Sequence, residues 1–327
     1  MHVPEGHSAP KIRPLGGAGI LRALDRVLPL GRHLHPVLSL LNGSEGLTAV
    51  PFAGRQLVHP LAWRKSVAAL LLRGEHCVPE ARLLPPLLAP LRSGTLLDVG
   101  ANIGIYTLLM RNASALPIMA YEPQPLLFRL LELCVAHNRL PNVECRALAC
   151  GDSKGEVPFS IGFNGEVATG EEAREVTTLD AFDLEQAIRE TGAAQAVVNV
   201  PVTTLDDDLG ETPVAFLKID CEGFEHRILR GAARLLERQR PLLFIEVHPF
   251  GLEKFGSSAR AVVDLLSPLY SLEGWDFSEI RFASKLVRSL RKHRPTEGRK
   301  FASMDEFLAA ARNEPRPAQL YLVGRPL

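Results

Sequence analysis

From residue 95 onward, short apolar runs alternate with stretches of helical pattern, and no other feature of the sequence restricts the fold as strongly. Apolar strands that alternate with helices form βαβ units, whose right-handed crossovers build a parallel sheet covered on both faces. The pattern therefore predicts a doubly wound α/β fold. The apolar runs are TLLDVG (95–100), PIMAYEP (117–123), VECRALAC (143–150), VAFLKID (214–220) and PLLFIEVHP (241–249).

Other segments flank or interrupt this alternation. Residues 1–92 are predicted to form an N-terminal extension with helical patterning and a β-hairpin at 47–60. Residues 93–327 are predicted to form the α/β domain, which QLYLVGRPL closes as a last strand. An insertion at about 155–205 separates the third and fourth parallel strands. A connection of that length usually carries function, such as a lid or a substrate loop.

Charge and cysteine content limit the expected partners and compartment. Lys plus Arg equals Asp plus Glu, at 37 each, so the overall charge gives no reason to expect nucleic acid binding. The five cysteines include no CxxC pair, which argues against a disulfide framework or a zinc site and favours a reducing compartment. We therefore predict a cytoplasmic location.

No apolar run approaches the roughly 18 residues of a membrane span, so we predict no transmembrane segment. The leucine-rich stretch at 15–41 fits a helix packed on the protein surface better than a helix resting on a membrane. Peripheral membrane contact stays open as the alternative. The basic run at 285–300 fits a solvated helix face better than a surface for anionic glycans or lipids.

The sequence LLDVGANIGIYT places a turn at the end of the first predicted strand. Gly100 and Gly104 bracket this turn, where glycines let the backbone approach a ligand and helix N–H groups face it. Ligands of open α/β sheets bind at this edge, where the strand order reverses. Asn102 stands where the dinucleotide fingerprint G-x-G-x-x-G has its middle glycine. The loop has no basic residue for phosphates, and Asp98 suits a cationic cofactor such as S-adenosylmethionine.

Two further acidic residues follow the next strands. Glu122, after the second strand, can accept hydrogen bonds from both ribose hydroxyls of a cofactor, although an acidic residue does the same in nicotinamide enzymes. Asp152, after the third strand, falls where an adenine edge would lie and can accept from its exocyclic amine. A simple turn role is an equal alternative for Asp152.

Several motifs together resemble the FkbM family of S-adenosylmethionine-dependent methyltransferases over about residues 95–250. The resemblance implies a Rossmann-like class I methyltransferase fold, a seven-stranded, mostly parallel sheet with an antiparallel last strand. It also implies O-methylation of sugar or polyketide hydroxyls, with the α/β domain as the catalytic domain. Cys221 and Phe224 depart from the small residues expected at their positions, which can reshape the acceptor side. The motifs are DVGANIGIYT, YEPQP, NRLPNV, VTTLDDDL, FLKIDCEGFEHRILRGA and FIEVHP, and the matching cofactor positions are Asp98, Gly100, Asn102, Gly104 and Glu122.

The stretch LKIDCEGFEH gathers charged residues at the end of the fourth parallel strand. Asp220 ends that strand beside the first, so we expect it at the transferred methyl group as the leading catalytic residue. Lys218 shares its strand face and can pair with Asp220 to keep it ionised. Glu222 stays open between an acceptor contact, a metal ligand and a turn residue. Glu225 fits a structural role in the first turn of a helix, and His226 is expected to point to solvent.

The motif FIEVHP adds Glu246 and His248 on one face at the end of the fifth strand. The ordinary pKa of histidine, about 6.5, suits His248 as a general base, with a structural role as the alternative. Together with Asp220 and Glu222, these residues offer ligands that suit Mg²⁺ or Mn²⁺. Their spacing is not a recognised metal motif, so we predict no metal site and keep Mg²⁺ as the less favoured alternative.

These features predict an S-adenosylmethionine-dependent O-methyltransferase that acts by in-line displacement on a hydroxyl of a sugar, a glycan or a polyketide-like metabolite. Its expected partner is a small-molecule or glycan acceptor. One alternative is a nicotinamide-dependent oxidoreductase, against which the missing G-x-G-x-x-G argues. The other is a non-catalytic methyltransferase-like binding module. The sequence does not indicate the oligomeric state.

Overall fold

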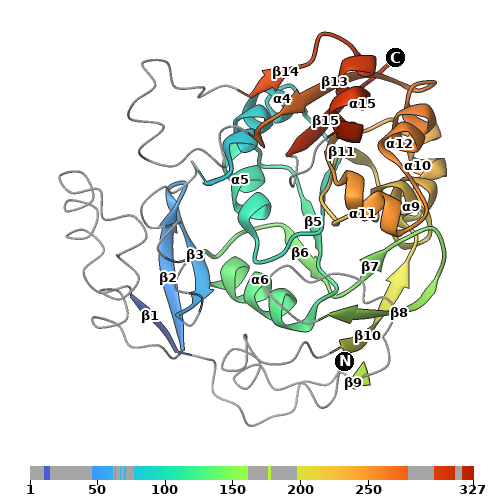
Figure 1. Ribbon diagram of the computed structural model, residues 1–327. Helices are drawn as coiled ribbons and strands as arrows, with labels where there is room; N and C mark the ends of the chain where they lie inside the picture. Colours follow the sequence, from blue (N-terminus) through green and yellow to red (C-terminus); the bar gives the residue numbers. More distant parts are fainter. Residues whose placement is uncertain are drawn as a thin grey trace.

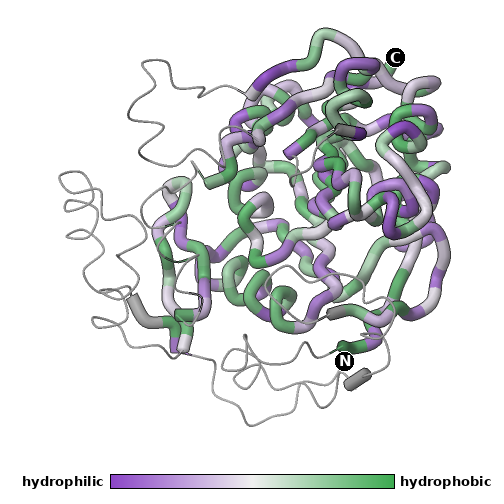
Figure 2. Tube along the Cα trace, in the orientation of Figure 1, coloured by the Kyte–Doolittle hydropathy of each residue, from purple (hydrophilic) through white to green (hydrophobic). Residues whose placement is uncertain are grey.

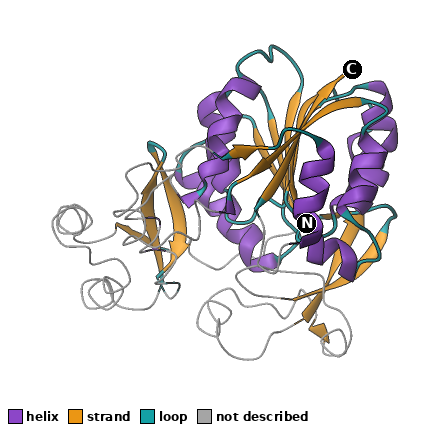
Figure 3. Cartoon of the chain, turned by 45° about the horizontal axis from the view of Figure 1, so that its top comes forward, coloured by secondary structure: helices purple, strands orange, loops and turns teal. Residues whose placement is uncertain are grey.

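The computed structural model describes residues 11–14, 46–61, 63, 67, 70, 77–160, 176–177, 197–278, 298–313 and 319–327. Among these residues, the main body is an eight-stranded sheet in the order β14-β13-β15-β12-β11-β4-β5-β6. Helices cover both faces of this sheet (Figures 1 and 3). The strands are β4 Thr95–Val99, β5 Ile118–Tyr121, β6 Val143–Arg146, β11 Val214–Ile219, β12 Leu242–Val247, β13 Tyr270–Asp276, β14 Arg299–Lys300 and β15 Leu320–Pro326.

The strand order reverses at β4, which lies between β5 and β11. The chain runs outward from β4 through β5 and β6, then returns and runs the other way through β11 and β12. All of these neighbours pair in parallel, whereas β15 is antiparallel to both β12 and β13. The predicted doubly wound fold with an antiparallel last strand is confirmed. The strand count differs from the predicted seven because the two-residue β14 adds to the edge beside β13.

The helices follow the apolar pattern of the sequence. Helix α6 begins at Pro125, and the Gln124 side chain caps it by accepting a hydrogen bond from the backbone N–H of Leu127 at 3.1 Å. Its apolar face is buried, and Figure 2 shows hydrophobic residues along it. The other helical elements are η3 Pro79–Leu83, α4 Leu84–Leu88, α5 Ile105–Ala113, α8 Leu205–Leu209, α9 Glu225–Arg230, α10 Ala233–Arg238, α11 Pro249–Lys254, α12 Ala259–Leu266 and α15 Met304–Asn313.

The run VECRALAC forms two strands in two different sheets, which corrects the prediction of one strand. Its first half is β6 of the large sheet, and its second half is β7, Ala149–Cys150. Strand β7 pairs with β10 (Val197–Thr203), which also pairs with β8 (Gly155–Ser160) and β9 (Val176–Thr177). The described part of the predicted insertion is therefore a small sheet, and 161–175 and 178–196 lie outside the described residues.

The predicted hairpin at 47–60 is confirmed as β2 (Leu47–Phe52) and β3 (Arg55–Pro60), with β1 (Ile12–Pro14) beside β2. Ala53 and Gly54 in its turn both have positive φ, as two-residue hairpin turns of type I′ require. The hairpin lies against α6 (Figure 1), where Asn138 accepts from the Gln56 N–H at 3.0 Å and donates to the Gln56 carbonyl at 2.6 Å.

Within the described residues, no helix has both the length and the apolar character needed to cross a membrane. The leucine-rich stretch predicted as a surface helix and most of the basic run at 285–300 lie outside those residues. Only the end of the basic run, 298–300, is described, and Arg299–Lys300 within it form β14.

Candidate active site

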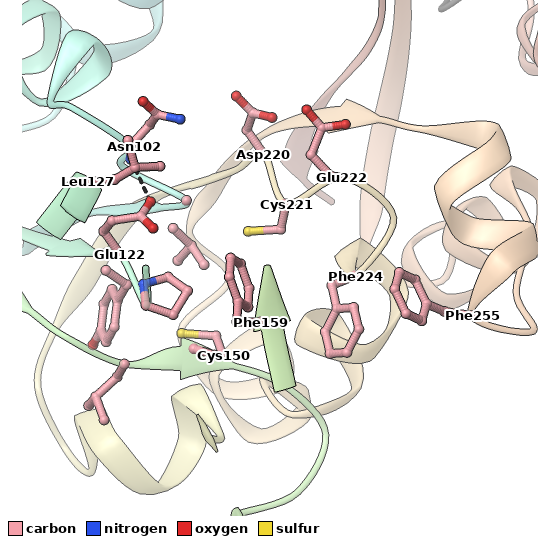
Figure 4. A pocket seen from close by; sticks show the side chains of 16 residues that line it. Asn102, Glu122, Leu127, Cys150, Phe159, Asp220, Cys221, Glu222, Phe224 and Phe255 are labelled. Atoms are coloured by element: carbon pink, nitrogen blue, oxygen red, sulfur yellow. Dashed lines mark hydrogen bonds between the residues drawn. The ribbon is translucent and has the colours of Figure 1, made fainter. Parts of the chain in front are cut away.

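A pocket of about 840 Å³, which includes space open to solvent, lies at the carboxyl ends of β4, β5 and β11. This edge includes the point where the strand order reverses, the usual ligand site of doubly wound sheets. Figure 4 shows Asn102, Glu122, Asp220 and Glu222 along one side of the pocket. Rings and sulfur atoms occupy the other side, from Phe159, Phe224, Phe255 and Cys150 (Figure 4).

The Glu122 carboxylate fixes the loop that follows β4. Its Oε2 accepts from the backbone N–H of Asn102 at 2.8 Å, and its Oε1 accepts from the N–H of Gln124 at 2.9 Å. The first bond holds Asn102 at φ 52°, in the left-handed region, where its own Oδ1 accepts from the Ile103 N–H. Burial raises the pKa of Glu122 to about 7, against the lowering effect of the two backbone hydrogen bonds.

Gly100 is required by the closeness of two strand ends. A Cβ at this position would lie 1.9 Å from the backbone oxygen of Asp220. The Asp220 N–H donates to the carbonyl of Val99 at 3.1 Å, so the ends of β4 and β11 are joined directly behind the pocket. At Gly104 a Cβ would lie 3.0 Å from Leu131 of α6. Both predicted loop glycines therefore serve close packing of the chain against itself.

Asp98 and Lys218 form a buried ion pair, and neither lines the pocket. The Lys218 Nζ lies 3.0 Å from Oδ1 of Asp98 and donates to the carbonyl of Gly100 at 2.8 Å. Thr107 donates to the other oxygen of Asp98 at 2.6 Å. Burial lowers the pKa of Lys218, but Asp98 and then Asp220 outweigh it, and the net pKa is raised. Asp98, predicted as a cofactor contact, thus lies one layer behind the pocket and holds Lys218.

Asp220 is half-buried at the end of β11 and lines the pocket, as expected for the leading catalytic candidate. Its Oδ2 lies 3.7 Å from the Lys218 Nζ, so the predicted pairing is present but longer than the pair with Asp98. Glu222 follows in the turn with a positive φ of 47° and also lines the pocket. The turn can approach α11 closely because Gly223 has no side chain. A Cβ at this position would lie 2.2 Å from the Gly251 carbonyl carbon.

His248 lies beside the pocket within a group of carboxylates. Its Nδ1 is 2.6 Å from Oε1 of Glu225, and its Nε2 faces Asp220, Glu222 and Glu246 at 3.6–3.8 Å. Burial lowers the pKa of His248, but Glu225 and Glu246 outweigh burial, and the net pKa lies well above 6.5. Burial, together with Asp220, raises the pKa of Glu246.

Glu225 is the site residue whose importance the sequence did not reveal. It is fully buried, it contacts His248, and its Oε1 also accepts from the Gly223 N–H at 3.0 Å. An acidic residue at a helix start is ordinary, so its position alone gave no signal. His226, expected to point to solvent, is half-buried. Asp152 lies 3.4 Å from Arg230 and is not among the residues that line the pocket.

The aromatic side of the pocket was also not predictable residue by residue. Phe159 comes from β8 of the small sheet, and Phe224 and Phe255 come from two turns of the main body. The Phe224 and Phe255 rings meet edge to face, with centroids 4.7 Å apart. No local motif predicts such contacts, because three distant chain segments supply them.

Comparison with known proteins identifies the family. The model of the methyltransferase FkbM domain matches residues 98–284, more than half of the chain. No curated protein matches the chain. A solved methyltransferase FkbM from Methylobacillus flagellatus KT is 15% identical with a TM-score of 0.39, over 92% of this chain and 60% of that one. This chain therefore spans less than two thirds of that protein's length.

Two other solved structures are similar at the same weak level. One is M. jannaschii TYW2 in complex with AdoMet, 10% identical with a TM-score of 0.42 over 88% of each chain. The other is an S-adenosylmethionine-dependent O-methyltransferase from Thermotoga maritima, 11% identical with a TM-score of 0.36, over 76% of this chain and 65% of that one. The domain match carries the conclusion that this chain belongs to the FkbM methyltransferase family.

Proposed function

We propose that the protein is an S-adenosylmethionine-dependent O-methyltransferase with 93–327 as its catalytic domain and 1–92 as an N-terminal extension. The observation that carries this proposal is the shared pocket of Glu122 and Asp220. These carboxylates directly follow β5 and β11, the two neighbours of β4, and both line the pocket over the loop that follows β4. One is suited to a cofactor ribose and the other to the reacting hydroxyl.

The pocket fits S-adenosylmethionine by the chemistry of its walls. Each Glu122 oxygen uses one lone pair on a backbone N–H and keeps another for a ribose hydroxyl. The phenylalanine rings and Leu148 offer an apolar place for an adenine. In the described part of the chain, no lysine or arginine lines the pocket, which suits a cationic sulfonium and disfavours the pyrophosphate of a dinucleotide. When bound, the cofactor supplies an electrophilic methyl group.

Asp220 is the residue we assign to the acceptor hydroxyl. It is half-buried at the pocket wall, where its carboxylate can accept a hydrogen bond from the hydroxyl and then its proton. Lys218 fixes the Gly100 carbonyl and faces Asp220, so it positions the loop and keeps a positive charge nearby. His248 is a poor proton acceptor while its pKa is raised, which favours Asp220 over the predicted base. Glu222 at the exposed rim is placed to contact the acceptor.

The acceptor we propose is a hydroxyl of a sugar, a glycan or a polyketide-like metabolite. Carboxylates such as Asp220 and Glu222 at the pocket mouth suit hydroxyl-rich molecules because they accept several hydrogen bonds. A radiolabelled methyl-transfer screen over glycan and small-molecule fractions of the native host tests this class. The five cysteines, all of which lie within the described residues, form no disulfide, which supports a reducing compartment such as the cytoplasm.

Calorimetric titration with S-adenosylhomocysteine and with NAD separates the candidate functions. We expect saturable binding of S-adenosylhomocysteine and none of NAD, and the reverse result would establish the oxidoreductase alternative. Asp220→Asn is expected to bind S-adenosylhomocysteine as the unsubstituted protein does and to lose methyl transfer. Full transfer by that variant would remove Asp220 from the reaction. Binding of S-adenosylhomocysteine without transfer to any fraction would favour the non-catalytic module.

A further inference from the structure

Three side chains at the ends of β11 and β12 converge on one point beside the pocket. The Nε2 of His248 lies 3.8 Å from Oδ1 of Asp220 and 3.6 Å from Oε1 of Glu246. One ligand atom from each of the three residues lies within 4.8 Å of the others. Two ligands of one divalent ion, each about 2.1–2.4 Å from it, are at most roughly 4–5 Å apart. The spacing therefore accommodates a single ion.

The imidazole is oriented toward this point by a residue outside the converging group. The Nδ1 of His248 is 2.6 Å from Oε1 of Glu225, which is fully buried. Imidazoles that bind metals almost always donate their other ring N–H to a carboxylate or carbonyl, which fixes the ring and makes the ligating nitrogen more basic. Glu225 therefore stands in the position of such an outer partner.

The two carboxylates are held in the same manner. One Glu246 oxygen accepts from the Tyr321 hydroxyl of β15. The other faces His248 and also accepts from the Gln319 side-chain amide at 3.5 Å. One Asp220 oxygen faces Lys218 at 3.7 Å, and the other faces His248. Each of the three candidate residues thus has one polar atom that contacts the surrounding fold and a second polar atom that faces the shared point.

Carboxylates surround this point and favour a cation there, and the imidazole gives up the proton that its raised pKa retains when an ion binds. Among the described residues, the lysine that contacts the group is Lys218, and Asp98 already balances it at 3.0 Å. Carboxylate oxygens within 4 Å of the His248 ring nitrogens come from Asp220, Glu222, Glu225 and Glu246.

We propose that Asp220, Glu246 and His248, with Glu222 as a fourth donor, bind one divalent cation of the Mg²⁺ and Mn²⁺ class. Oxygen ligands suit these ions, so the three carboxylates decide the class of ion, although an imidazole is a ligand more typical of Zn²⁺ or Fe²⁺. Such an ion takes about six ligands, so positions remain for oxygen atoms of an acceptor. The contact between the ion and an acceptor rests on the proposed function, whereas the binding of the ion to the protein does not. Sequence spacing predicted no site because the donors come from two strands and a turn.

Titration of the chelator-stripped full chain with Mn²⁺, followed by electron paramagnetic resonance of the free ion, tests the proposal. We expect saturable binding of a single ion per chain. His248→Ala should abolish it, Asp220→Asn should weaken it because one anionic ligand is lost, and Glu225→Gln should weaken it by about 10- to 100-fold because the outer partner is lost. Glu253→Gln, at an exposed position of α11, is the matched control and should bind as the unsubstituted protein does.

Absence of saturable Mn²⁺ binding, or binding that Asp220→Asn leaves unchanged, overturns the proposal. Asp220→Asn keeps the shape of a half-buried side chain, so it decides the matter even if His248→Ala does not fold. S-adenosylhomocysteine is titrated against the same preparation. Its binding without Mn²⁺ binding rejects the ion site alone, and Mn²⁺ binding without it rejects the proposed function alone.

Discussion

The Nζ of Lys218 lies 3.0 Å from Oδ1 of Asp98 in the interior, between the end of β4 and the end of β11. Both side chains are buried, and the same Nζ donates to the Gly100 carbonyl of the pocket loop. Two residues that looked like separate site candidates are thus one structural unit. The pair ties the loop after β4 to the strand that carries Asp220.

Lys218→Met should destabilise the protein by ~3–5 kcal/mol, because it leaves the Asp98 carboxylate buried without its counter-charge. Urea unfolding followed by circular dichroism measures the change. Lys154→Met is the matched control, since Lys154 pairs with Asp207 at 3.2 Å on the surface and should change the stability far less. Equal effects of the two substitutions would show that the buried pair does not support the fold.

The affinity for S-adenosylhomocysteine should rise as the pH increases through about 7. The pKa of Glu122 is raised to about 7 by burial, and ribose hydroxyls donate to its anionic form, so ligand binding is favoured once Glu122 loses its proton. Calorimetry between pH 6 and 8, about one unit on each side of that pKa, measures how steeply the affinity changes with pH. Glu122→Gln should flatten this dependence, and a slope that survives in this variant would assign it to another group.

Asp152→Asn at the neighbouring rim tests the predicted adenine contact in the same titration. Asp152 pairs with Arg230 and does not line the pocket, so we expect the affinity for S-adenosylhomocysteine to stay within about two-fold, less than the loss of one hydrogen bond. A larger loss of affinity would restore Asp152 to the cofactor site.

The stability of the N-terminal hairpin should fall as the pH drops from about 6.5 to about 4. Burial lowers the pKa of His59 to about 4, against the raising effect of its bond to Pro60. The unfolded chain therefore takes up the proton first, at about 6.5, and the difference amounts to about 3 kcal/mol. Fluorescence of Trp63, whose ring meets His59 edge to face, can follow the unfolding.

His59→Gln should remove the loss of hairpin stability between pH 6.5 and 4, because glutamine can keep a hydrogen bond to Pro60 but does not titrate in this range. His137→Gln, at an exposed position at the end of α6, is the control and should leave the slope as it is. If His59→Gln keeps the full slope, the pH dependence arises elsewhere.

Gly223→Ala should destabilise the protein and lower methyl transfer together. The residue has φ 107°, and the added Cβ would lie 2.2 Å from the Gly251 carbonyl carbon, so the turn that carries Glu222 must move. Gly256→Ala separates the two causes, because Gly256 has φ 71° but nothing within 4 Å of its Cβ position. It should cost only about 1–2 kcal/mol of backbone strain. Similar thermal unfolding of both variants would contradict the steric explanation.

The sequence by itself determined the fold class, the edge of the sheet that carries the pocket, and the family. Strand and helix periods are local, and the loop after β4 is one continuous motif, so the sequence alone assigns Asn102 and Glu122 to this edge of the sheet. The hairpin followed from its turn and its alternating apolar pattern. The split of VECRALAC between two sheets could not be read, because nothing local tells a strand which neighbour it will pair with.

Tertiary structure decided what each charged residue of the site does. Asp98 and Lys218 are 120 positions apart in the chain but 3.0 Å apart in space, and Glu225 at the start of α9 meets His248 just after the end of β12. Burial then shifts their pKa values, and burial depends on every element packed around them. A charged residue in the sequence is thus only a candidate for the site. Its ion-pair partner, its burial and its role are decided by how the strands and helices pack together.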